Sequence, residues 1–196
     1  MTNYKTAKAI RALLIIVIVV FVVALGVSIF YTMFYKDSTT QVDTSKESLL
    51  NSSVNHSVKM TVRGSIIADE DFRSYQILVT PNSRTFTTYK GYQGQIISTT
   101  NLDNNVPAYE EFVHALDIAK LADGTELTGD SNNTQGVCAT GKLYQFEIIK
   151  SGKTIKKLWT TSCSSAKGSL SSNLETVSSL FIQQIPDART AIRNLW

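Results

Sequence analysis

The stretch CATGKLYQFEIIKSGKTIKKLWTTSC, residues 138–163, contains the features that decide the fold. Apolar and polar side chains alternate in both of its halves, which is the pattern of strands with one buried face. The alternating residues are Tyr144, Phe146 and Ile148 in the first half and Ile155, Lys157, Trp159 and Thr161 in the second. Ser151-Gly152 lies between the halves and favours a tight turn. The stretch therefore predicts an antiparallel β-hairpin.

The position of the turn also predicts the register of this hairpin. The expected pairs are Lys150–Lys153, Ile148–Ile155 and Tyr144–Trp159. In this register apolar side chains of the two strands lie opposite each other on one face, which stabilises a strand pair.

The same register places the only two cysteines of the chain close together. Cys138 is expected to face Ser165, and Cys163 to face Thr140, so the cysteines are diagonal neighbours. A bulge near Gly141 would bring their Cα atoms within the roughly 7 Å that a disulfide needs. A disulfide closing this loop would stabilise the fold by roughly 3–4 kcal/mol. The alternatives are two buried free thiols or redox or metal chemistry, but the C-x-x-C spacing is absent and two thiols alone make a poor zinc site.

The N-terminal part of the sequence predicts a membrane anchor. Residues 12–35 contain no charged side chain and are long enough for a transmembrane helix. A cleaved signal peptide is the alternative, but its apolar core would be shorter. Lys5, Lys8 and Arg11 precede the apolar run, so residues 1–11 are expected in the cytoplasm and everything after residue 35 outside it. We therefore expect a single-pass protein of the cell membrane with an extracytoplasmic C-terminal domain.

Beyond the apolar run, composition separates a linker from a folded domain. Residues 36–56 are rich in Ser, Thr, Asn and Asp and predict a flexible tether. Residues 57–196 are enough for one core of ordinary domain size. The net charge of +3 equals the contribution of the three cations before residue 36, so the domain itself is neutral. A neutral domain without a clustered basic patch argues against nucleic acid as a partner.

The domain sequence predicts an α+β fold in the order β-β-β-(β)-α-β-β-α. Alternation predicts strands over 58–67, 73–80 and 84–90, with a short further strand at 95–99. One helix is expected from the apolar stripe Tyr109, Phe112, Val113, Leu116 and Ala119. The last helix is expected between Gly168 and Pro186, with Ser172 and Glu175 as its capping box. We expect an antiparallel sheet with both helices packed on one face, in a strand order that the patterns leave open.

No motif predicts catalysis, a metal site or a cofactor. The segments Ser164-Ser165-Ala166-Lys167 and Lys150-Ser151-Gly152 resemble motifs of penicillin-recognising serine enzymes, but they occur in the reverse order. The two histidines, His56 and His114, lie apart in the sequence. The acidic groups at 69–71 and 123–130 lack the spacing of a calcium loop, so we interpret them as solvated turns.

Two tyrosines are the candidate binding residues. Tyr89 and Tyr92 lie in or beside the glycine-containing turn GYQG, residues 91–94. Tyrosine on a loop can stack on a sugar or a peptide, and the alternative is plain packing within the turn.

The segments GVCATGKLYQFEII, LWTTSC and LFIQQIPDA, between Gly136 and Ala188, resemble uncharacterised single-pass surface proteins of the Saccharibacteria-type reduced-genome bacteria. That group has no assigned activity, so the resemblance implies a bacterial cell-surface location and no site residues. We expect a non-catalytic extracytoplasmic domain that binds an envelope or protein partner. The alternatives are a structural subunit of a membrane or cell-surface assembly and, third, a serine hydrolase-like enzyme. The oligomeric state stays open.

Overall fold

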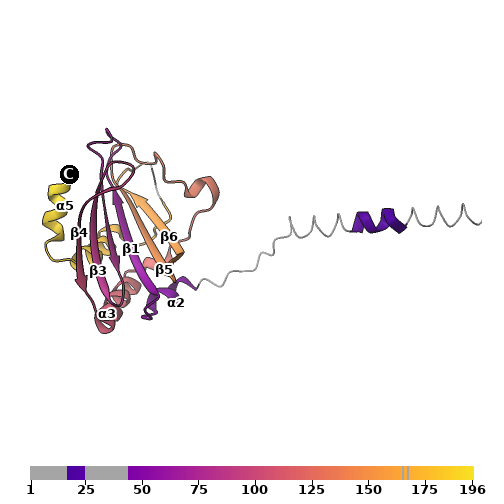
Figure 1. Ribbon diagram of the computed structural model, residues 1–196, viewed down its shortest axis with the longest axis horizontal. Coiled ribbons are helices and arrows are strands. Elements are labelled where there is room, and N and C mark those ends of the chain that lie inside the picture. Colours follow the sequence, from indigo (N-terminus) through magenta and orange to yellow (C-terminus); the bar gives the residue numbers. More distant parts are fainter. Residues whose placement is uncertain (1–16, 25–43, 165, 167) are drawn as a thin grey trace, which may run out of the picture. The chain divides into compact units, whose positions relative to one another are not determined.

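The structure of the protein is a computed structural model that describes residues 17–24, 44–164, 166 and 168–196 (Figure 1). The chain divides into two units, Met1–Val42 and Asp43–Trp196. Within the first unit, residues 17–24 are helical and their side chains are exposed.

The predicted fold class is wrong in its N-terminal part. Among the described residues, no helix is both long enough and apolar enough to cross a membrane. Residues 1–16 and 25–35, which include most of the predicted anchor and its cytoplasmic stub, lie outside the described residues. The fold is a single six-stranded antiparallel sheet with helices.

The expected linker also needs correction at its C-terminal end. Helix α2, Ser45–Leu50, lies within the range 36–56 that the composition predicts as a flexible tether. Its Leu49 is fully buried and belongs to the hydrophobic core, and the first strand already begins at His56. Residues 36–43 of the predicted linker lie outside the described residues. Burial of the Leu49 side chain contributes about 2 kcal/mol to holding this short helix against the core.

The sheet has the strand order β4-β3-β2-β1-β5-β6. Its strands are β1 (His56–Arg63), β2 (Arg73–Val79), β3 (Ser83–Lys90), β4 (Gln95–Asp103), β5 (Leu143–Lys150) and β6 (Lys153–Thr161). The first four strands follow one another as a meander, and the β5–β6 hairpin pairs with β1. Strand β1 therefore lies in the interior of the sheet, and β4 and β6 form its edges.

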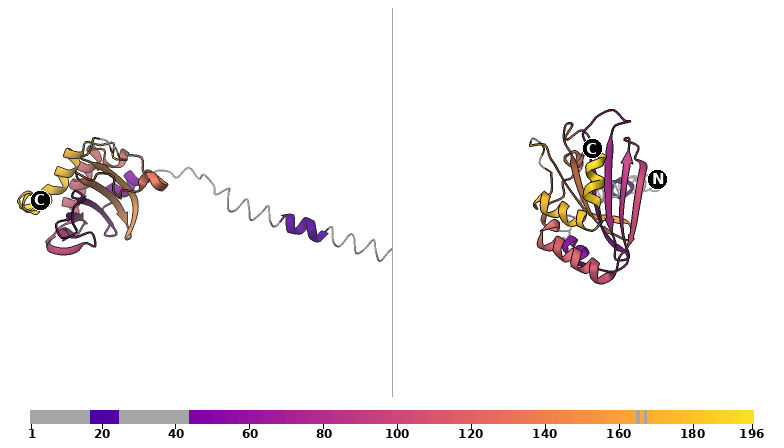
Figure 2. Two further views of the ribbon diagram at one scale, coloured as in Figure 1. Left: turned by 90° about the horizontal axis from the view of Figure 1, so that it is seen from above. Right: turned by 90° about the vertical axis from the view of Figure 1, so that its left-hand side faces the viewer.

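One face of the sheet carries the core. A row of buried side chains crosses five strands at the same height: Phe86, Ile77, Met60, Phe146 and Leu158. The remaining helices are α3 (Val106–Ile118), α4 (Leu174–Gln183) and α5 (Ala188–Leu195), together with two short 3-10 turns at Leu121–Asp123 and Gly129–Asn132. The helices contribute buried residues to the same core, so they lie on the same side of the sheet (Figures 1 and 2).

Two aromatic contacts of Phe181 join α4 to α3 and to the sheet. The Phe181 ring of α4 lies 5.3 Å from Phe112 of α3, edge to face, and 5.8 Å from Phe146 of β5. The apolar stripe predicted for α3 is confirmed, and the Asn105 side chain caps this helix by accepting a bond from the Ala108 amide. Helix α4 begins later than predicted, because Asn173 caps it at Thr176 and the Ser172–Glu175 capping box does not form.

The β5–β6 hairpin turns where the sequence predicts it, but the predicted register is wrong beyond the turn. Lys150 pairs with Lys153 and Ile149 with Thr154, after which Ile148 pairs with Lys156. Ile155 is thus a bulge residue and is 38% exposed. The bulge reverses the faces of the rest of β6. Lys156 and Leu158 point into the core, and Trp159 points to the opposite face.

The opposite face of the sheet is partly covered by the loop that follows α3. Trp159 Nε1 donates to Asn132 Oδ1 at 3.1 Å, and Gln145 Nε2 donates to Thr134 Oγ1 at 3.3 Å. Both donors belong to the β5–β6 hairpin and both acceptors to the segment 129–136. These bonds hold the loop over the hairpin and bring residues 134–138 beside the end of β1.

Candidate functional site: a cleft beside the disulfide

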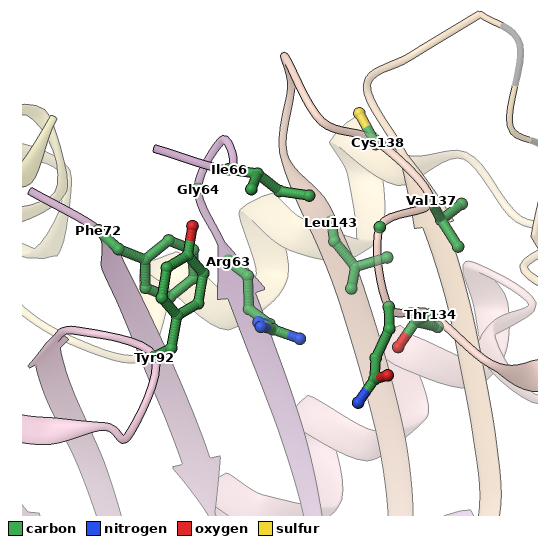
Figure 3. Close-up of a pocket in the computed structure, with 11 residues that line it drawn as sticks. Arg63, Gly64, Ile66, Phe72, Tyr92, Thr134, Val137, Cys138 and Leu143 are labelled. Carbon is green, nitrogen blue, oxygen red and sulfur yellow. The ribbon is translucent and has the colours of Figure 1, made fainter. Parts of the chain in front are cut away.

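A cleft of about 360 Å³ lies on this second face, where β1 ends and β5 begins (Figure 3). We call it the Arg63 cleft. Its lining consists of Arg63, Gly64 and Ile66 from the end of β1, the aromatic residues Phe72 and Tyr92, and residues 134–138 with Leu143. The antiparallel order explains the position of the cleft, because the end of β1 and the starts of the neighbouring strands β2 and β5 meet at the same end of the strands.

The aromatic wall of the cleft is a stacked pair. The Phe72 and Tyr92 rings lie 4.2 Å apart between centroids and are inclined by 22°. The Tyr92 hydroxyl donates to the Ile67 carbonyl at 2.7 Å and accepts from the Ile67 amide at 3.0 Å. The Tyr92 amide donates to Asp69 Oδ1 at 2.7 Å. The GYQG turn is therefore fastened to the loop between β1 and β2 before any ligand is present.

Arg63 supplies the charge of the cleft. Its guanidinium carbon lies 5.5 Å from the centroid of the Phe72 ring, in a cation–π contact. Figure 3 shows this side chain projecting between the Phe72–Tyr92 pair and Leu143. Among the described residues no hydrogen bond or ion pair of the guanidinium is found. Lys59, on the same strand and the same face, is by contrast paired with Glu147 at 3.0 Å.

The opposite wall is held by the cysteines. Cys138 and Cys163 are within disulfide distance, with their Cα atoms 5.8 Å apart, and Cys138 lines the cleft. Next to Cys138, the Ala139 carbonyl accepts a bond of 2.7 Å from the Ile66 amide. Hydrogen bonds thus join the β1–β2 loop on one side to the disulfide loop, through Ala139, and on the other side to the Tyr92 turn.

Gly141 lets the two cysteines approach each other. A Cβ atom at this position would collide with the sulfur atoms of both Cys138 and Cys163 and with the Ser162 hydroxyl. The sequence predicts a bulge near Gly141 that brings the two cysteines within disulfide distance. The structure gives a different reason, since the bulge is at Ile155 and Gly141 supplies space.

The structure separates the two tyrosines that the sequence predicts as binding residues. Tyr92 is 43% exposed and lines the cleft. Tyr89 lies opposite Ile96 in the β3–β4 pair and does not line it. Arg63 and Phe72 are not recognised as site residues from the sequence. Their signal is weak, because Arg63 is the last residue of β1 and Phe72 precedes β2, and each acquires its role only when β1 pairs with β5.

A second cavity, of about 500 Å³, lies on the other side of the β1–β2 loop. Ile67 lines this cavity, whereas its neighbour Ile66 lines the Arg63 cleft. Lys142 Nζ lies 4.3 Å from the centroid of the Trp196 ring there, and burial lowers the pKa of Lys142. The cation–π contact makes Trp196 part of the wall, so this cavity is formed by packing against the last helical turn.

The residues considered for catalysis are far apart. The Lys150-Ser151-Gly152 turn lies at one end of the β5–β6 hairpin, and Ser164 follows the other end. A strand of this length separates them by roughly 25–30 Å. His56 is buried at the start of β1, whereas His114 is exposed on α3. Within the described ranges no group of three or more His, Cys, Asp or Glu side chains could hold a metal ion.

Comparison with known protein families finds no family model that matches the chain. A search of characterised proteins likewise finds no significant match. The relationship to Saccharibacteria-type surface proteins that residues 136–188 suggest therefore stays a prediction.

Proposed function

We propose that the protein is a non-catalytic binding domain that recognises an envelope component or a protein partner through the Arg63 cleft. The observation that carries this proposal is the construction of the cleft: an exposed Tyr92 ring stacked on the buried Phe72 ring, and an arginine without a polar partner among the described residues, braced by hydrogen bonds and a disulfide. Ligand sites are commonly preformed concave surfaces with aromatic walls and few polar groups. A volume of about 360 Å³ suits one or two units of a peptide or glycan chain.

The proposal places the domain in an oxidising, extracytoplasmic compartment. Disulfides persist mainly in such compartments, and Cys138 and Cys163 are at bonding distance. The resemblance to bacterial surface proteins agrees with the same location.

Binding arrays test this function directly. The full chain is applied to immobilised peptides and glycans, in parallel with Tyr92→Ala and with Tyr89→Ala as the matched control. We expect a discrete set of ligands that Tyr92→Ala loses and Tyr89→Ala retains. Urea unfolding of each variant verifies that it is folded. No bound ligand at all, or binding that Tyr92→Ala leaves unchanged, would contradict the proposal.

A second candidate function is that of a subunit in a self-associating assembly. Edge strand β4 favours it, because all of its residues except Leu102 are exposed, including Ile96 and Ile97. An exposed edge strand can pair with a further strand, although the bulge between β3 and β4 interrupts the ladder near Ile97. Measurement of native mass with and without Ile97→Lys distinguishes the candidates. A monomer that is unaffected by the substitution excludes the assembly.

A further inference from the structure

The Arg63 guanidinium indicates which chemical class of ligand the cleft binds. A guanidinium offers up to five donors in a planar fork, and it remains charged at any physiological pH. Phe72 contacts Arg63 only through its ring, so the hydrogen-bonding capacity of the guanidinium is not used by the described residues. A cation held at an enclosed surface without an anion favours an anionic ligand.

The number of charges favours a carboxylate over a phosphate. Arg63 is the only charged residue among those that line the cleft. One guanidinium matches one carboxylate with two parallel hydrogen bonds, and it balances the single negative charge. A phosphate group carries up to two charges at neutral pH and would remain partly uncompensated here.

The remaining walls specify what accompanies the carboxylate. Leu143, Val137 and Ile66 present apolar surface around the same space, opposite the Phe72–Tyr92 pair (Figure 3). A polar group that faces these three residues would lose water without gaining a partner, whereas an apolar or aromatic group would gain contact. The polar residues of the lining, Thr134 and Gln135, precede Val137 in the same loop.

We infer that the Arg63 cleft binds ligands that carry a carboxylate next to an apolar or aromatic group, with Arg63 as the carboxylate-binding residue. This inference rests on the proposed function and names the ligand class of that site. The same chemistry occurs at the C-terminus of a peptide that ends in an apolar residue and in a free aryl-alkyl acid. Both sources are included in the test.

The test titrates the full chain with matched acid and amide pairs and follows backbone amide shifts by NMR. The peptide arm uses N-acetyl-phenylalanine and N-acetyl-phenylalaninamide, and the free-acid arm uses 3-phenylpropanoate and 3-phenylpropanamide. We expect each acid to bind at least about tenfold more tightly than its amide, which is the effect of a hydrogen bond to a charged group. A tighter peptide arm identifies a peptide terminus as the source, and a tighter free-acid arm identifies the free acid. Either result supports the inferred class, as do equal arms, which show that the acetamido group is not recognised.

Substitutions assign the effect to Arg63. Arg63→Gln is expected to abolish the preference for acid over amide, and Arg63→Lys to retain part of it. Lys59→Gln is the matched control, because Lys59 is a cation four residues away on the same strand and the same face, and its substitution should leave the preference intact. Equal binding of acid and amide by the unmodified protein overturns the inference but leaves the array result, and with it the proposed function, standing. Failure of all four compounds to bind, or a preference that survives in Arg63→Gln, also overturns it.

Discussion

The ring of Tyr92 stacks on the ring of Phe72, with 4.2 Å between their centroids. The two residues belong to different connections of the sheet, since Phe72 precedes β2 and Tyr92 follows β3. Because the Phe72 ring also contacts the Arg63 guanidinium, the pair positions the one charged group of the cleft. Stacking and the two hydrogen bonds of the Tyr92 hydroxyl together make this wall rigid.

Removing the Tyr92 hydroxyl should therefore loosen the wall without removing the aromatic stack. We expect Tyr92→Phe to lower the free energy of unfolding by about 1 kcal/mol, the usual net contribution of a hydrogen bond. The amide of Ile67, which loses its acceptor, should exchange its hydrogen faster. Urea unfolding and hydrogen exchange measure the two effects. In the control Tyr89→Phe, whose hydroxyl has no hydrogen bond among the described residues, both quantities should stay unchanged.

The second prediction concerns the disulfide and the wall that it holds. The double variant Cys138→Ser, Cys163→Ser should lose roughly 3 kcal/mol of stability, because the unfolded chain is no longer constrained. The Ile66 amide should also exchange faster, since its acceptor is the carbonyl next to Cys138. Reduction of the unmodified protein should reproduce both effects and change nothing in the variant. If exchange at Ile66 stays slow after reduction, the disulfide does not support the cleft.

The β-bulge at Ile155 has an energetic consequence at the next residue. Lys156 is 6% exposed, and its Nζ donates to the Ala122 carbonyl at 2.6 Å, which fastens the 3-10 turn Leu121–Asp123 to β6. We expect Lys156→Ala to lower the free energy of unfolding by about 2–4 kcal/mol, through lost packing of the stem and loss of a charged hydrogen bond. Lys156→Met, which keeps most of the stem, should cost less than Lys156→Ala.

Lys157→Ala serves as the control for this prediction. Lys157 is the neighbouring lysine on the opposite face, and its substitution should change stability by no more than about 0.5 kcal/mol. Equal effects at Lys156 and Lys157 would contradict the bulged register, because the predicted regular register places Lys157 on the face of Ile155.

His56 should make stability depend on pH. It is 3% exposed, its Nδ1 lies 2.7 Å from the Ser53 hydroxyl, and its Nε2 is without a partner among the described residues. Burial, followed by the charge of Lys150, lowers the pKa of His56 below its ordinary value of 6.5. Below the ordinary value the unfolded chain therefore binds a proton that the folded protein does not, and stability decreases as the pH falls.

The measurement is urea unfolding between about pH 7 and pH 5.5, above the range in which most carboxylates titrate. The free energy of unfolding should fall by up to about 1.4 kcal/mol per pH unit in the lower part of this window. His56→Gln should flatten the curve, and His114→Gln, at an exposed position of α3, should not. A slope that persists in His56→Gln would assign the effect to other groups.

Much of the sheet could be predicted from alternation, and the exceptions have physical causes. The positions of the strands and of the hairpin turn follow from local patterns, but the bulge does not. Alternation in Ile155-Lys156-Lys157 predicts that the isoleucine points inside, whereas the structure buries Lys156, whose charged end reaches the Ala122 carbonyl. A side chain that is long enough to bring its charge to an acceptor is not recognisable from polarity alone.

The helical and long-range parts were predictable to different degrees. The stripe of α3 identifies its buried face, and Pro107 lies in its first turn as expected. Helix α2 is missed because only one residue, Leu49, is fully buried in a polar stretch. The Arg63 cleft is missed because it depends on the pairing of β1 with β5, segments that are far apart in the sequence. Of the residues that line the cleft, only Tyr92 and Cys138 could be identified in advance, Tyr92 from its position between two glycines and Cys138 as half of the expected disulfide.

The location of bound ligand is the most direct test of the central claim that the Arg63 cleft is the binding site. Backbone amide shifts of the full chain are mapped while a ligand identified on the arrays is added. The account predicts that the largest shifts fall on Gly64, Ile66, Tyr92, Gly136 and Cys138, which line the cleft. Shifts concentrated instead on strand β4, or on the cavity beside Trp196, would contradict it.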